Sequence, residues 1–262
     1  MEDDSIVNSL FDLSGKVAVI TGSTRGIGRA IAEAMARAGA KVVISSRKAD
    51  KCAEVAQAIK SEGLEATPIA CNIGKRDDLE RLVAGTKQRF GRIDSLVCNA
   101  AVNPYYGPMA QAPDEAFTKI IDSNVRSNLW LCNMVIPEMA ERRDGSVIIV
   151  SSIGGLKGSS MLGIYGISKA ADMQLARNLA VEWGSSNIRA DCIAPGLVRT
   201  DFARALWENP ETLAKAEALY PLRRIGEPEE IAGMAVLLAS RAGNWITGQT
   251  IVIDGGATIG GG

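Results

Sequence analysis

Short apolar runs alternate with amphipathic segments along most of the chain. Residues 17–20 (VAVI) form one such run, and residues 26–38 carry Ile27 and Ile31 at helical spacing before Gly39 ends the pattern. The same order of a β-branched run and a helical segment then repeats. The runs predicted as strands are residues 17–20, 41–46, 66–71, 93–98, 147–151, 188–193 and 250–253.

The predicted strands are apolar on both faces and are separated by helical segments, which is typical of a parallel sheet covered on two sides. We therefore expect an α/β fold with a doubly wound, seven-stranded parallel sheet, in one domain spanning residues 1–262. The longest helical patterns cover residues 113–141, with Pro137 inside, and residues 162–183. Residues 196–228 are too polar and interrupted to be core, and such an insert before the last helix is typical of a lid over a site.

Composition and charge exclude several classes of protein. Of the 262 residues, 47% are hydrophobic and 23% are charged, and the formal net charge is −1. No apolar run reaches the roughly 18 residues of a membrane span, and near-neutral charge argues against a nucleic-acid surface. The acidic start and the Ile-Gly-Gly-Gly end, which lacks a Ser-Lys-Leu-like address, favour a cytoplasmic protein.

The sequence contains no histidine, and this excludes several kinds of active site together. Ser-His-Asp hydrolysis, Cys-His proteolysis and most zinc catalysis need an imidazole. The five cysteines are scattered and form no CxxC pair, which is typical of reduced thiols in a core and predicts no metal site. Acid–base chemistry must therefore come from Tyr, Lys, Asp, Glu or Cys.

A glycine-rich loop with the sequence TGSTRGIG follows the first predicted strand and opens the first helix. Missing Cβ atoms let a backbone approach a pyrophosphate, whose negative charge is favoured at a helix N-terminus. The alternative is that the glycines only permit close packing of the strand on the helix. The position after the first β–α unit favours a dinucleotide site. The residues expected to hold the dinucleotide here are Gly22, Ser23, Thr24, Arg25, Gly26, Ile27 and Gly28.

The end of the second predicted strand favours NADP(H) over NAD(H). An NAD site normally places an acidic residue there for the ribose 2′-hydroxyl. This sequence instead has Ser46, followed by Arg47 and Lys48. Arg47 and Arg25 offer guanidinium donors to a 2′-phosphate. The alternative is that both arginines are simply solvated.

Candidate catalytic residues cluster in the second half of the chain. Tyr165 and Lys169 lie four positions apart, on one face of a predicted helix. Ser152 lies just past the end of a predicted strand, where ligands gather in open α/β sheets. Asn124 lies in the preceding long helical pattern. Each signal is weak by itself, since these residues could also be a cap, a buried amide and an aromatic anchor, but the combination is specific.

In these residues the chain resembles the short-chain dehydrogenase/reductase family, in its single-domain branch with a Rossmann-type fold. The resemblance covers almost the whole sequence. Within the family, the chain looks most similar to NADPH-dependent carbonyl and retinol reductases of the peroxisomal type. The segments that carry the resemblance are TGSTRGIG, the Asn99-Ala100-Ala101 segment, Asn124, Ser152, Tyr165, Lys169, Pro195-Gly196 with Thr200, and GQTIVIDGG near the end.

The resemblance implies a role for each candidate catalytic residue. Tyr165 would protonate a carbonyl oxygen as hydride arrives, or act as the base in the reverse reaction. Lys169 would favour ionisation of the phenol through its positive charge and hold the nicotinamide ribose. Ser152 would position the substrate oxygen, and Asn124 would hold a water that links Lys169 to solvent.

The sequence departs from the family pattern at two places near the expected adenosine. Ala101 stands where the family has a glycine, which is tolerable only if φ is negative there. Asn72 stands where many members carry an aspartate for the adenine amino group, and its amide oxygen can still accept that bond. The further residues expected around the cofactor are Asn72, Ile73, Asn99, Ala100, Ala101, Pro195, Gly196, Val198 and Thr200.

The expected substrate pocket is mainly apolar, which favours a hydrophobic or medium-sized ketone or secondary alcohol. The residues expected to line it are Ser152, Ile153, Leu156, Met161, Leu162, Phe202, Leu206 and Trp207. The three residues of the lid segment are equally consistent with an amphipathic helix that packs on the body or contacts another subunit.

Three functions fit the sequence. The first is an NADP-dependent carbonyl reductase or alcohol dehydrogenase. The second is a reductase of 3-oxoacyl thioesters on acyl carrier protein or coenzyme A, for which Arg142 and Arg143 would supply part of a basic rim. The third is a nucleotide-sensing protein without turnover. The resemblance also implies a homotetramer, paired through residues 113–141, residues 162–183 and the C-terminal strand.

Overall fold

Seven parallel strands form the centre of the computed structural model, which describes residues 3–260. Their order in the sheet is β3-β2-β1-β4-β5-β6-β7, and every neighbouring pair is parallel. The α/β doubly wound sheet expected from the sequence is therefore confirmed. The strands are β1 (Val17–Thr21), β2 (Lys41–Ser45), β3 (Ala66–Pro68), β4 (Ser95–Cys98), β5 (Gly145–Val150), β6 (Ile188–Pro195) and β7 (Thr250–Ile253).

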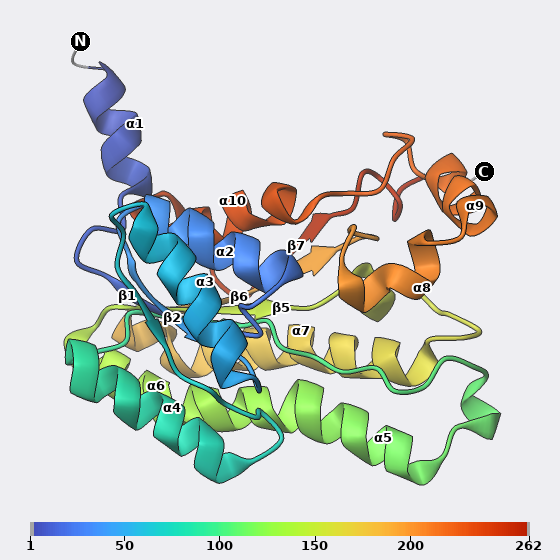
Figure 1. Cartoon of the computed structure of the whole chain (residues 1–262), viewed down its shortest axis with the longest axis horizontal. Coiled ribbons are helices and arrows are strands. Elements are labelled where there is room, and N and C mark those ends of the chain that lie inside the picture. The colour runs from blue at the N-terminus through green and yellow to red at the C-terminus, as the bar shows by residue number, and fades with distance from the viewer. Residues whose placement is uncertain (1–2, 261–262) are drawn as a thin grey trace.

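Helices cover both faces of the sheet (Figure 1). On one face α2, α3 and α10 contribute buried residues such as Ile31, Val55 and Leu238, and on the other α4, α6 and α7 contribute Leu82, Leu131 and Met173. An N-terminal helix that the sequence pattern did not predict, α1, projects from the body (Figure 1). The helices are α1 (Asp3–Phe11), α2 (Gly26–Arg37), α3 (Ala49–Ser61), α4 (Arg76–Phe90), α5 (Asp114–Ile121), α6 (Ser127–Arg142), α7 (Gly163–Trp183), α8 (Arg204–Trp207), α9 (Pro210–Leu219) and α10 (Pro228–Ala239).

Two elements differ from the sequence prediction. β3 ends at Pro68, which has no N–H for the ladder, although Ile69 and Cys71 still donate backbone hydrogen bonds to β2 and the segment after it. The helical pattern of residues 113–141 is divided, because a π-helical turn at Asp122–Arg126 separates α5 from α6. Short 3₁₀ turns lie at η1 (Met109–Gln111), η3 (Ile153–Gly155), η4 (Gly184–Ser186), η5 (Asp201–Ala203) and η6 (Arg241–Gly243).

The segment of residues 196–228 contains more helix and more buried side chains than its sequence suggests. It contains α8 and α9, and Val198, Tyr220 and Ile225 within it are only 4%, 8% and 2% exposed. The expectation that this segment contributes nothing to the core is therefore wrong for these side chains. Tyr220 and Ile225 pack with Ile153 and Ala257 in a small apolar cluster of their own.

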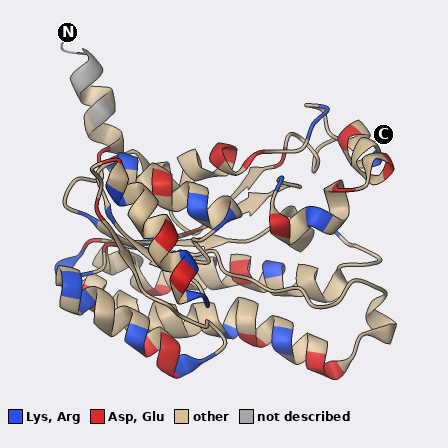
Figure 2. Ribbon diagram, viewed as in Figure 1, with Lys and Arg blue, Asp and Glu red and all other residues tan. Residues whose placement is uncertain are grey.

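Charged side chains lie mostly on the outer surfaces of the helices, with both signs interspersed along elements such as α4 and α5 (Figure 2). This agrees with the formal net charge of −1. The acidic start and the glycine-rich end include residues 1–2 and 261–262, which lie outside the described residues.

The core predicts a sharp contrast between two leucines. Leu131 of α6 is 0% exposed, so Leu131→Ala should lower the free energy of unfolding by about 2–5 kcal/mol through lost burial and a residual cavity. Leu219, at the end of α9, is 67% exposed, and Leu219→Ala should change the free energy of unfolding by about 0.5 kcal/mol or less. Urea unfolding followed by circular dichroism checks both, and equal effects would contradict this assignment of the core.

Candidate active site

The strand order reverses between β1 and β4, and Thr21 joins the ends of these two strands. Thr21 Oγ1 accepts backbone hydrogen bonds from Asn99 at 3.0 Å and Ala100 at 3.1 Å. On the other side, Ser23 Oγ accepts a hydrogen bond from the backbone N–H of Ser45 at 2.8 Å. These contacts fix the start of the glycine loop in the crevice where open α/β sheets bind ligands.

The three glycines of the loop serve different physical purposes. Gly22 and Gly26 have φ values of +68° and +54°, a backbone conformation that favours glycine. At Gly28, an added Cβ would lie 2.3 Å from Asn99 Nδ2, so this position is closed by the protein itself. At Gly26, an added Cβ would lie 3.1 Å from Thr200 Cγ2. Close packing therefore accounts for Gly28 and turn conformation for Gly26, while both apply at Gly22, where an added Cβ would lie 2.9 Å from Asn99 Nδ2.

The start of α2 fits the pyrophosphate of a dinucleotide. Arg25 is the N-cap residue with extended backbone, and its side chain does not cap the helix. The first-turn N–H groups of α2 therefore keep their capacity to donate, and no acidic residue lies in that turn. Thr24 and Ile27 flank this position, where the positive end of the helix favours an anion.

Cationic side chains lie at the end of β2, as the sequence predicted. Arg47 and Lys48 are exposed there, while the backbone N–H of Ser46 donates to Cys52 Sγ at 3.2 Å. Arg25 Nη1 lies 3.6 Å from Asp201 Oδ2 at the start of the lid segment. In dinucleotide-binding folds, the end of the second strand meets the adenosine ribose. Here residues 46–48 include no carboxylate, and guanidinium groups lie nearby.

The two departures near the expected adenosine are structurally mild. Ala101 does not have a positive φ, so alanine is tolerated there without backbone strain. Asn72 Oδ1 accepts a hydrogen bond from Gly74 N at 3.1 Å, which leaves a second lone pair available. Ile73, next to Asn72, packs against the core.

The residues after β6 connect the crevice to the lid segment. Pro195 ends β6, and Gly196 packs so closely that an added Cβ would lie 2.9 Å from Asp254 Cα. Val198 is buried, and Thr200 Oγ1 accepts a hydrogen bond from the backbone of Ala203 at 3.3 Å.

Ser152 and Tyr165 face the same point beyond the end of β5. An added Cβ at Gly154 would lie 3.4 Å from Ser152 Oγ and 3.9 Å from the Tyr165 ring, so both side chains border Gly154. Ser152 Oγ accepts the backbone N–H of Gly154 at 3.1 Å and thereby caps η3. This acceptor role leaves the hydroxyl hydrogen able to donate to a ligand. The serine is therefore both a turn cap and a candidate substrate contact.

Lys169 lies beneath the tyrosine and is buried. Its Nζ is 5.7 Å from the centre of the Tyr165 ring and donates hydrogen bonds to Val150 O at 2.9 Å and Asp172 Oδ2 at 3.0 Å. Burial by itself would lower the pKa of Lys169, but the negative charge of Asp172, its hydrogen bond and the influence of Tyr165 together outweigh burial and hold that pKa above its ordinary value. The lysine is therefore held as an ammonium ion.

Asn124 lies in the π-helical turn, and protein groups engage its side chain. Its Oδ1 accepts from Val102 N at 2.8 Å, and its Nδ2 donates to Val102 O at 3.0 Å and to Ser168 Oγ at 3.1 Å. The backbone carbonyl of Asn124 accepts from Asn128 Nδ2 at 2.6 Å. Side-chain contacts thus connect Asn124 to Lys169 through Asn128 and Asp172, and the water that the family resemblance implied stays a prediction.

Asn128 and Asp172 are the residues that the sequence interpretation missed. One available signal was periodicity, because Asp172 lies one turn beyond Ser168 and Lys169 on the buried face of α7. Asn128 gave no comparable signal, since its partner Asp172 is 44 positions away in the chain.

The predicted substrate residues divide into two groups. Phe202 lies beside Tyr165, with 6.2 Å between ring centres, and is 51% exposed. Leu156 is also exposed, while Met161 and Leu162 are half-buried just before α7. All four side chains are at least partly accessible, and Phe202 is the one in contact with the tyrosine ring.

The other predicted substrate residues make structural contacts. Ile153 is 7% exposed and packs in the Tyr220 cluster. Trp207 Nε1 donates to Thr200 O at 2.9 Å, and its ring stacks with Arg199. Leu206 lies half-buried beside it in α8. Within the lid segment, Phe202 is therefore the residue that the structure brings to the tyrosine.

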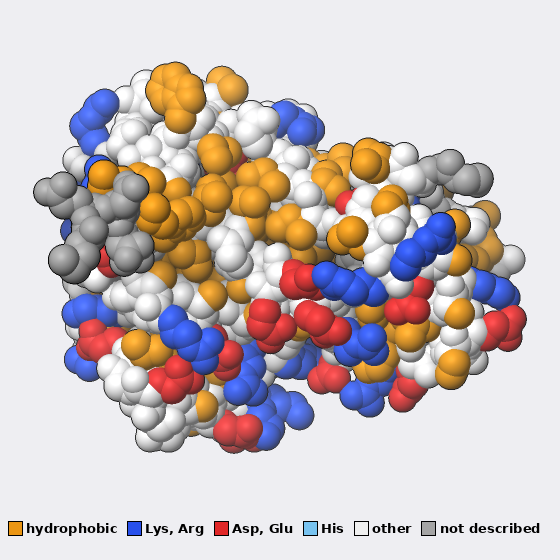
Figure 3. Space-filling model, turned by 90° about the horizontal axis from the view of Figure 1, so that it is seen from above, with side chains coloured by type: hydrophobic (Ala, Val, Ile, Leu, Met, Phe, Trp, Pro, Cys, Tyr) orange, Lys and Arg blue, Asp and Glu red, His pale blue; other side chains and the backbone are white. Residues whose placement is uncertain are grey.

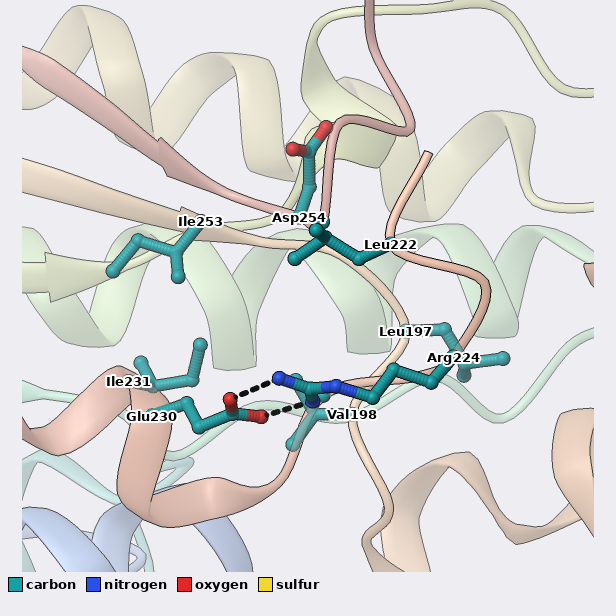
Figure 4. A pocket seen from close by; sticks show the side chains of 10 residues that line it. Leu197, Val198, Leu222, Arg224, Glu230, Ile231, Ile253 and Asp254 are labelled. Carbon is teal, nitrogen blue, oxygen red and sulfur yellow. Dashed lines mark hydrogen bonds and ion pairs between the residues drawn. The ribbon is translucent and has the colours of Figure 1, made fainter. Parts of the chain in front are cut away.

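A separate cavity of about 90 Å³ lies behind the lid segment (Figure 4). Leu197, Leu222 and Ile231 line it, and Arg224 closes one side through a double ion pair with Glu230, at 2.5 and 2.7 Å. The hydrogen bond from this guanidinium lowers the pKa of Glu230 to about 2. None of the candidate catalytic residues borders this cavity.

Two further kinds of site are absent from residues 3–260. No group of three or more Asp, Glu or Cys side chains in this part of the chain is arranged to hold a metal ion. Likewise, none of its helices combines the length and apolar character that crossing a bilayer requires.

Known proteins are similar to this chain in sequence. A sequence model of the family described as enoyl-(acyl carrier protein) reductase matches residues 22–258. Dehydrogenase/reductase SDR family member 4 of Bos taurus is 45% identical over 245 residues, covering 94% of this chain and 88% of that protein.

Solved structures of dehydrogenases are similar to this chain in fold as well. A 7α-hydroxysteroid dehydrogenase in complex with NADH and 7-oxo glycochenodeoxycholic acid is 35% identical, with a TM-score of 0.91 over 95% of this chain and 96% of that one. A gluconate 5-dehydrogenase of Burkholderia cenocepacia in complex with NADP and tartrate is 29% identical, with a TM-score of 0.92 over 97% and 99%. The chain therefore belongs to the short-chain dehydrogenase/reductase family and is an NAD(P)-dependent oxidoreductase that acts on CH–OH and C=O groups.

Proposed function

We propose that this protein is an NADP-dependent reductase of apolar or medium-sized ketones, working also as a secondary-alcohol dehydrogenase. The observation that carries the proposal is the arrangement of Ser152, Tyr165 and Lys169 at the end of β5, next to the crevice that holds the glycine loop. When bound, the nicotinamide dinucleotide supplies or accepts the hydride. The residues of this chain supply the proton, the orientation and the charge.

In the reduction, the hydroxyl of Ser152 donates a hydrogen bond to the substrate carbonyl oxygen and fixes it near Tyr165. The phenol of Tyr165 then gives its proton to that oxygen, so the phenol becomes a phenolate as the new O–H bond forms and the C=O double bond becomes a single bond. The ammonium of Lys169, 5.7 Å from the ring centre, stabilises the negative charge left on the tyrosine. In the oxidation, the same groups work in the opposite sense.

The proposed function also assigns each part of the dinucleotide to residues of this chain. The glycine loop and the start of α2 would bind the pyrophosphate, and Lys169 would bind the nicotinamide ribose. Arg47 and Arg25 would bind the 2′-phosphate that distinguishes NADP from NAD. One neighbouring structure contains NADP and another contains NADH, so the preference rests on these arginines.

An apolar ketone is favoured by the side chains near the tyrosine. Phe202 stands beside Tyr165, and Leu156 is 48% exposed after Ser152. The lid role of residues 196–228 is part of this proposal, because Thr200 and Asp201 touch the glycine loop and Phe202 touches the tyrosine. A basic rim for a carrier protein has less support, since Arg142 is engaged by Glu138 and by Ile93 O.

The assembly that we propose is a homotetramer. Apolar side chains are exposed on α5, α6 and α7, including Phe117 at 46%, Leu129 at 40% and Val181 at 87%. On another face, hydrophobic side chains gather together (Figure 3), and Trp245 near β7 is 100% exposed. Association would bury both apolar surfaces. We also place the protein in the cytoplasm, because all five of its cysteines are buried and free, as in a reducing compartment.

The assigned proton donor can be tested directly. Tyr165→Phe removes only the phenol oxygen, so ketone-dependent NADPH oxidation should fall by about 10²-fold or more while NADPH affinity stays nearly unchanged. Tyr106→Phe removes the same atom from a 60% exposed side chain and should leave kcat within about twofold of the parent protein. A panel of free ketones and carrier-bound 3-oxoacyl substrates, followed at the NADPH absorbance band, provides the measurement.

Undiminished turnover in Tyr165→Phe would reject this proton donor. Activity on carrier-bound substrates far above that on free ketones would transfer the proposal to thioester reduction. Tight NADPH binding with no turnover on any carbonyl would instead identify a nucleotide-sensing protein.

Cofactor preference gives a second test. Arg47→Ser should lower kcat/KM for NADPH by about 10-fold to 100-fold through loss of a charge-assisted hydrogen bond, and should leave kcat/KM for NADH nearly constant. Lys60→Ser removes a charge from the other end of α3 and should change neither value. Equal losses with both cofactors would contradict a contact to the 2′-phosphate.

The proposed assembly predicts a third result. Native mass spectrometry should give four copies of the chain, and Val181→Glu, which places a carboxylate on the exposed face of α7, should shift the population to smaller species. Glu182→Gln changes the neighbouring residue in the same helix without adding a charge and should leave the tetramer intact. A monomeric parent protein would rule the assembly out.

A further inference from the structure

The ammonium of Lys169 has a built-in counter-ion that the family resemblance did not imply. Asp172 lies one helical turn further along α7, and its Oδ2 accepts a hydrogen bond from Lys169 Nζ at 3.0 Å. The side chains of Lys169 and Asp172 are only 3% and 0% exposed, so solvent does not screen their interaction. The pair is therefore strongly coupled in a low-dielectric environment.

A second element fixes the carboxylate in this position. Asn128 of α6 donates from Nδ2 to Asp172 Oδ1 at 3.0 Å and to Asn124 O at 2.6 Å. Both oxygens of the Asp172 carboxylate are thus bonded, one to the lysine and one to the amide. The chain of contacts ties the π-helical turn in which Asn124 lies to the lysine beneath the tyrosine.

Within residues 3–260, the surroundings of the pair offer no second anion to which Lys169 donates a hydrogen bond. Burial raises the pKa of the Cys192 thiol, and a hydrogen bond to Cys132 together with burial raises that of Cys98, so these two thiols stay neutral. The charges of Asp191 and Arg177 also act on Cys192, more weakly than those of Asp172 and Lys169. The titratable groups that face the pair are Tyr165 of α7, Cys98 of β4, Cys132 of α6 and Cys192 of β6.

We propose that Asp172 is a positioning residue that keeps Lys169 protonated and directed toward Tyr165, and that Asn128 holds Asp172 in place for this task. The proposal rests on the function proposed above, because it gives the pair a part in proton transfer. A buried ion pair is often replaceable by apolar residues at no cost in stability, so stability alone does not account for it.

The charge of Asp172 has a consequence that a merely structural carboxylate would lack. Removing a negative charge makes every protonated neighbour lose its proton at lower pH. In ketone reduction the site must hold the proton that Tyr165 donates and the ammonium that supports it. Loss of either proton ends activity, and the two groups titrate as a coupled pair. The alkaline limit of the reaction should therefore depend on Asp172.

The first test compares pH profiles of kcat/KM for ketone reduction. Asp172→Asn keeps the shape and removes the charge, so the alkaline limb should move to lower pH by about one to three units, with kcat reduced even on the acidic side. Asp172→Glu retains the charge and should keep the limb close to that of the parent protein. Asp191→Asn, the matched control, removes another buried carboxylate whose Oδ1 accepts from Gln249 N, and should not move the limb.

Asn128→Ala tests the position of the Asp172 carboxylate separately from its charge. It removes the amide that fixes Asp172 Oδ1 and leaves the charge of Asp172 in place, so kcat should fall while the alkaline limb stays nearly where it is. A parallel profile in Asp172→Asn, with lower rates but the same limb as the parent, would overturn the proposal and leave Asp172 a structural residue.

The second test does not depend on turnover. Lysine labelled with ¹³C at Cε reports the protonation of each amine by NMR, and the Lys169 signal is assigned by its absence in Lys169→Arg. We expect this signal to titrate above the ordinary lysine range in the parent protein and at distinctly lower pH in Asp172→Asn, because the neighbouring negative charge is lost. If Asp172→Asn does not fold, Asp172→Ser is measured in its place.

These outcomes separate the inference from the proposed function. No turnover on any carbonyl, with a Lys169 signal that does shift in Asp172→Asn, would reject the proposed function and keep the counter-ion. Turnover that depends on Tyr165, with an unshifted Lys169 signal and an unshifted limb, would reject the counter-ion and keep the function.

Discussion

Burial of the sheet on both faces constrains the whole molecule, because it leaves polar side chains room mainly where the strands end. The strands β1, β4 and β5 are buried along their entire length, and each is followed at its carboxyl end by polar residues. Thr21, Asn99 and Ser152 all stand at such ends. Since the strand order reverses between β1 and β4, the crossover connections diverge there and leave a crevice. The position of the candidate site follows from this topology, and the residues at the strand ends decide its chemistry.

The same burial makes an ammonium ion under the tyrosine expensive. Moving a charged group out of water costs several kcal/mol even after relaxation of the protein, and a lone lysine in such a place tends to lose its proton instead. In this protein two acceptors stabilise the ammonium. Lys169 Nζ donates hydrogen bonds to the carboxylate of Asp172, one turn away, and to the carbonyl of Val150. The electrostatic support of the site is therefore assembled from α7, α6 and the end of β5 together.

Much of this architecture was predictable from the sequence, and the exceptions have physical reasons. β-branched runs buried on both faces are strong local signals, so the strands and the helices α2 and α7 were placed nearly correctly. A helix carrying Leu206 and Trp207 was one of the alternatives left open, whereas α9 was not predicted. The core contribution of this segment was also missed, because Tyr220 and Ile225 find their apolar partners in distant segments such as Ile153 and Ala257. Tyr165, Lys169 and Ser152 were recognisable by spacing and position. The contact between Asn128 and Asp172 joins two helices and left no local trace.

The π-helical turn at Asp122–Arg126 gives the helix from α5 to α6 one residue more than a regular α-helix would hold over the same length. Because the turn holds one residue more than a regular helix of the same length, deleting one residue here would restore a regular α-helix and leave α6 at nearly the same rotation about its axis. The deletion would instead change the turn itself, where Asn124 lies and where its backbone carbonyl accepts a hydrogen bond from Asn128. The extra residue therefore sets the local position of Asn124, whereas the packing of the rest of α6 against the sheet does not depend on it.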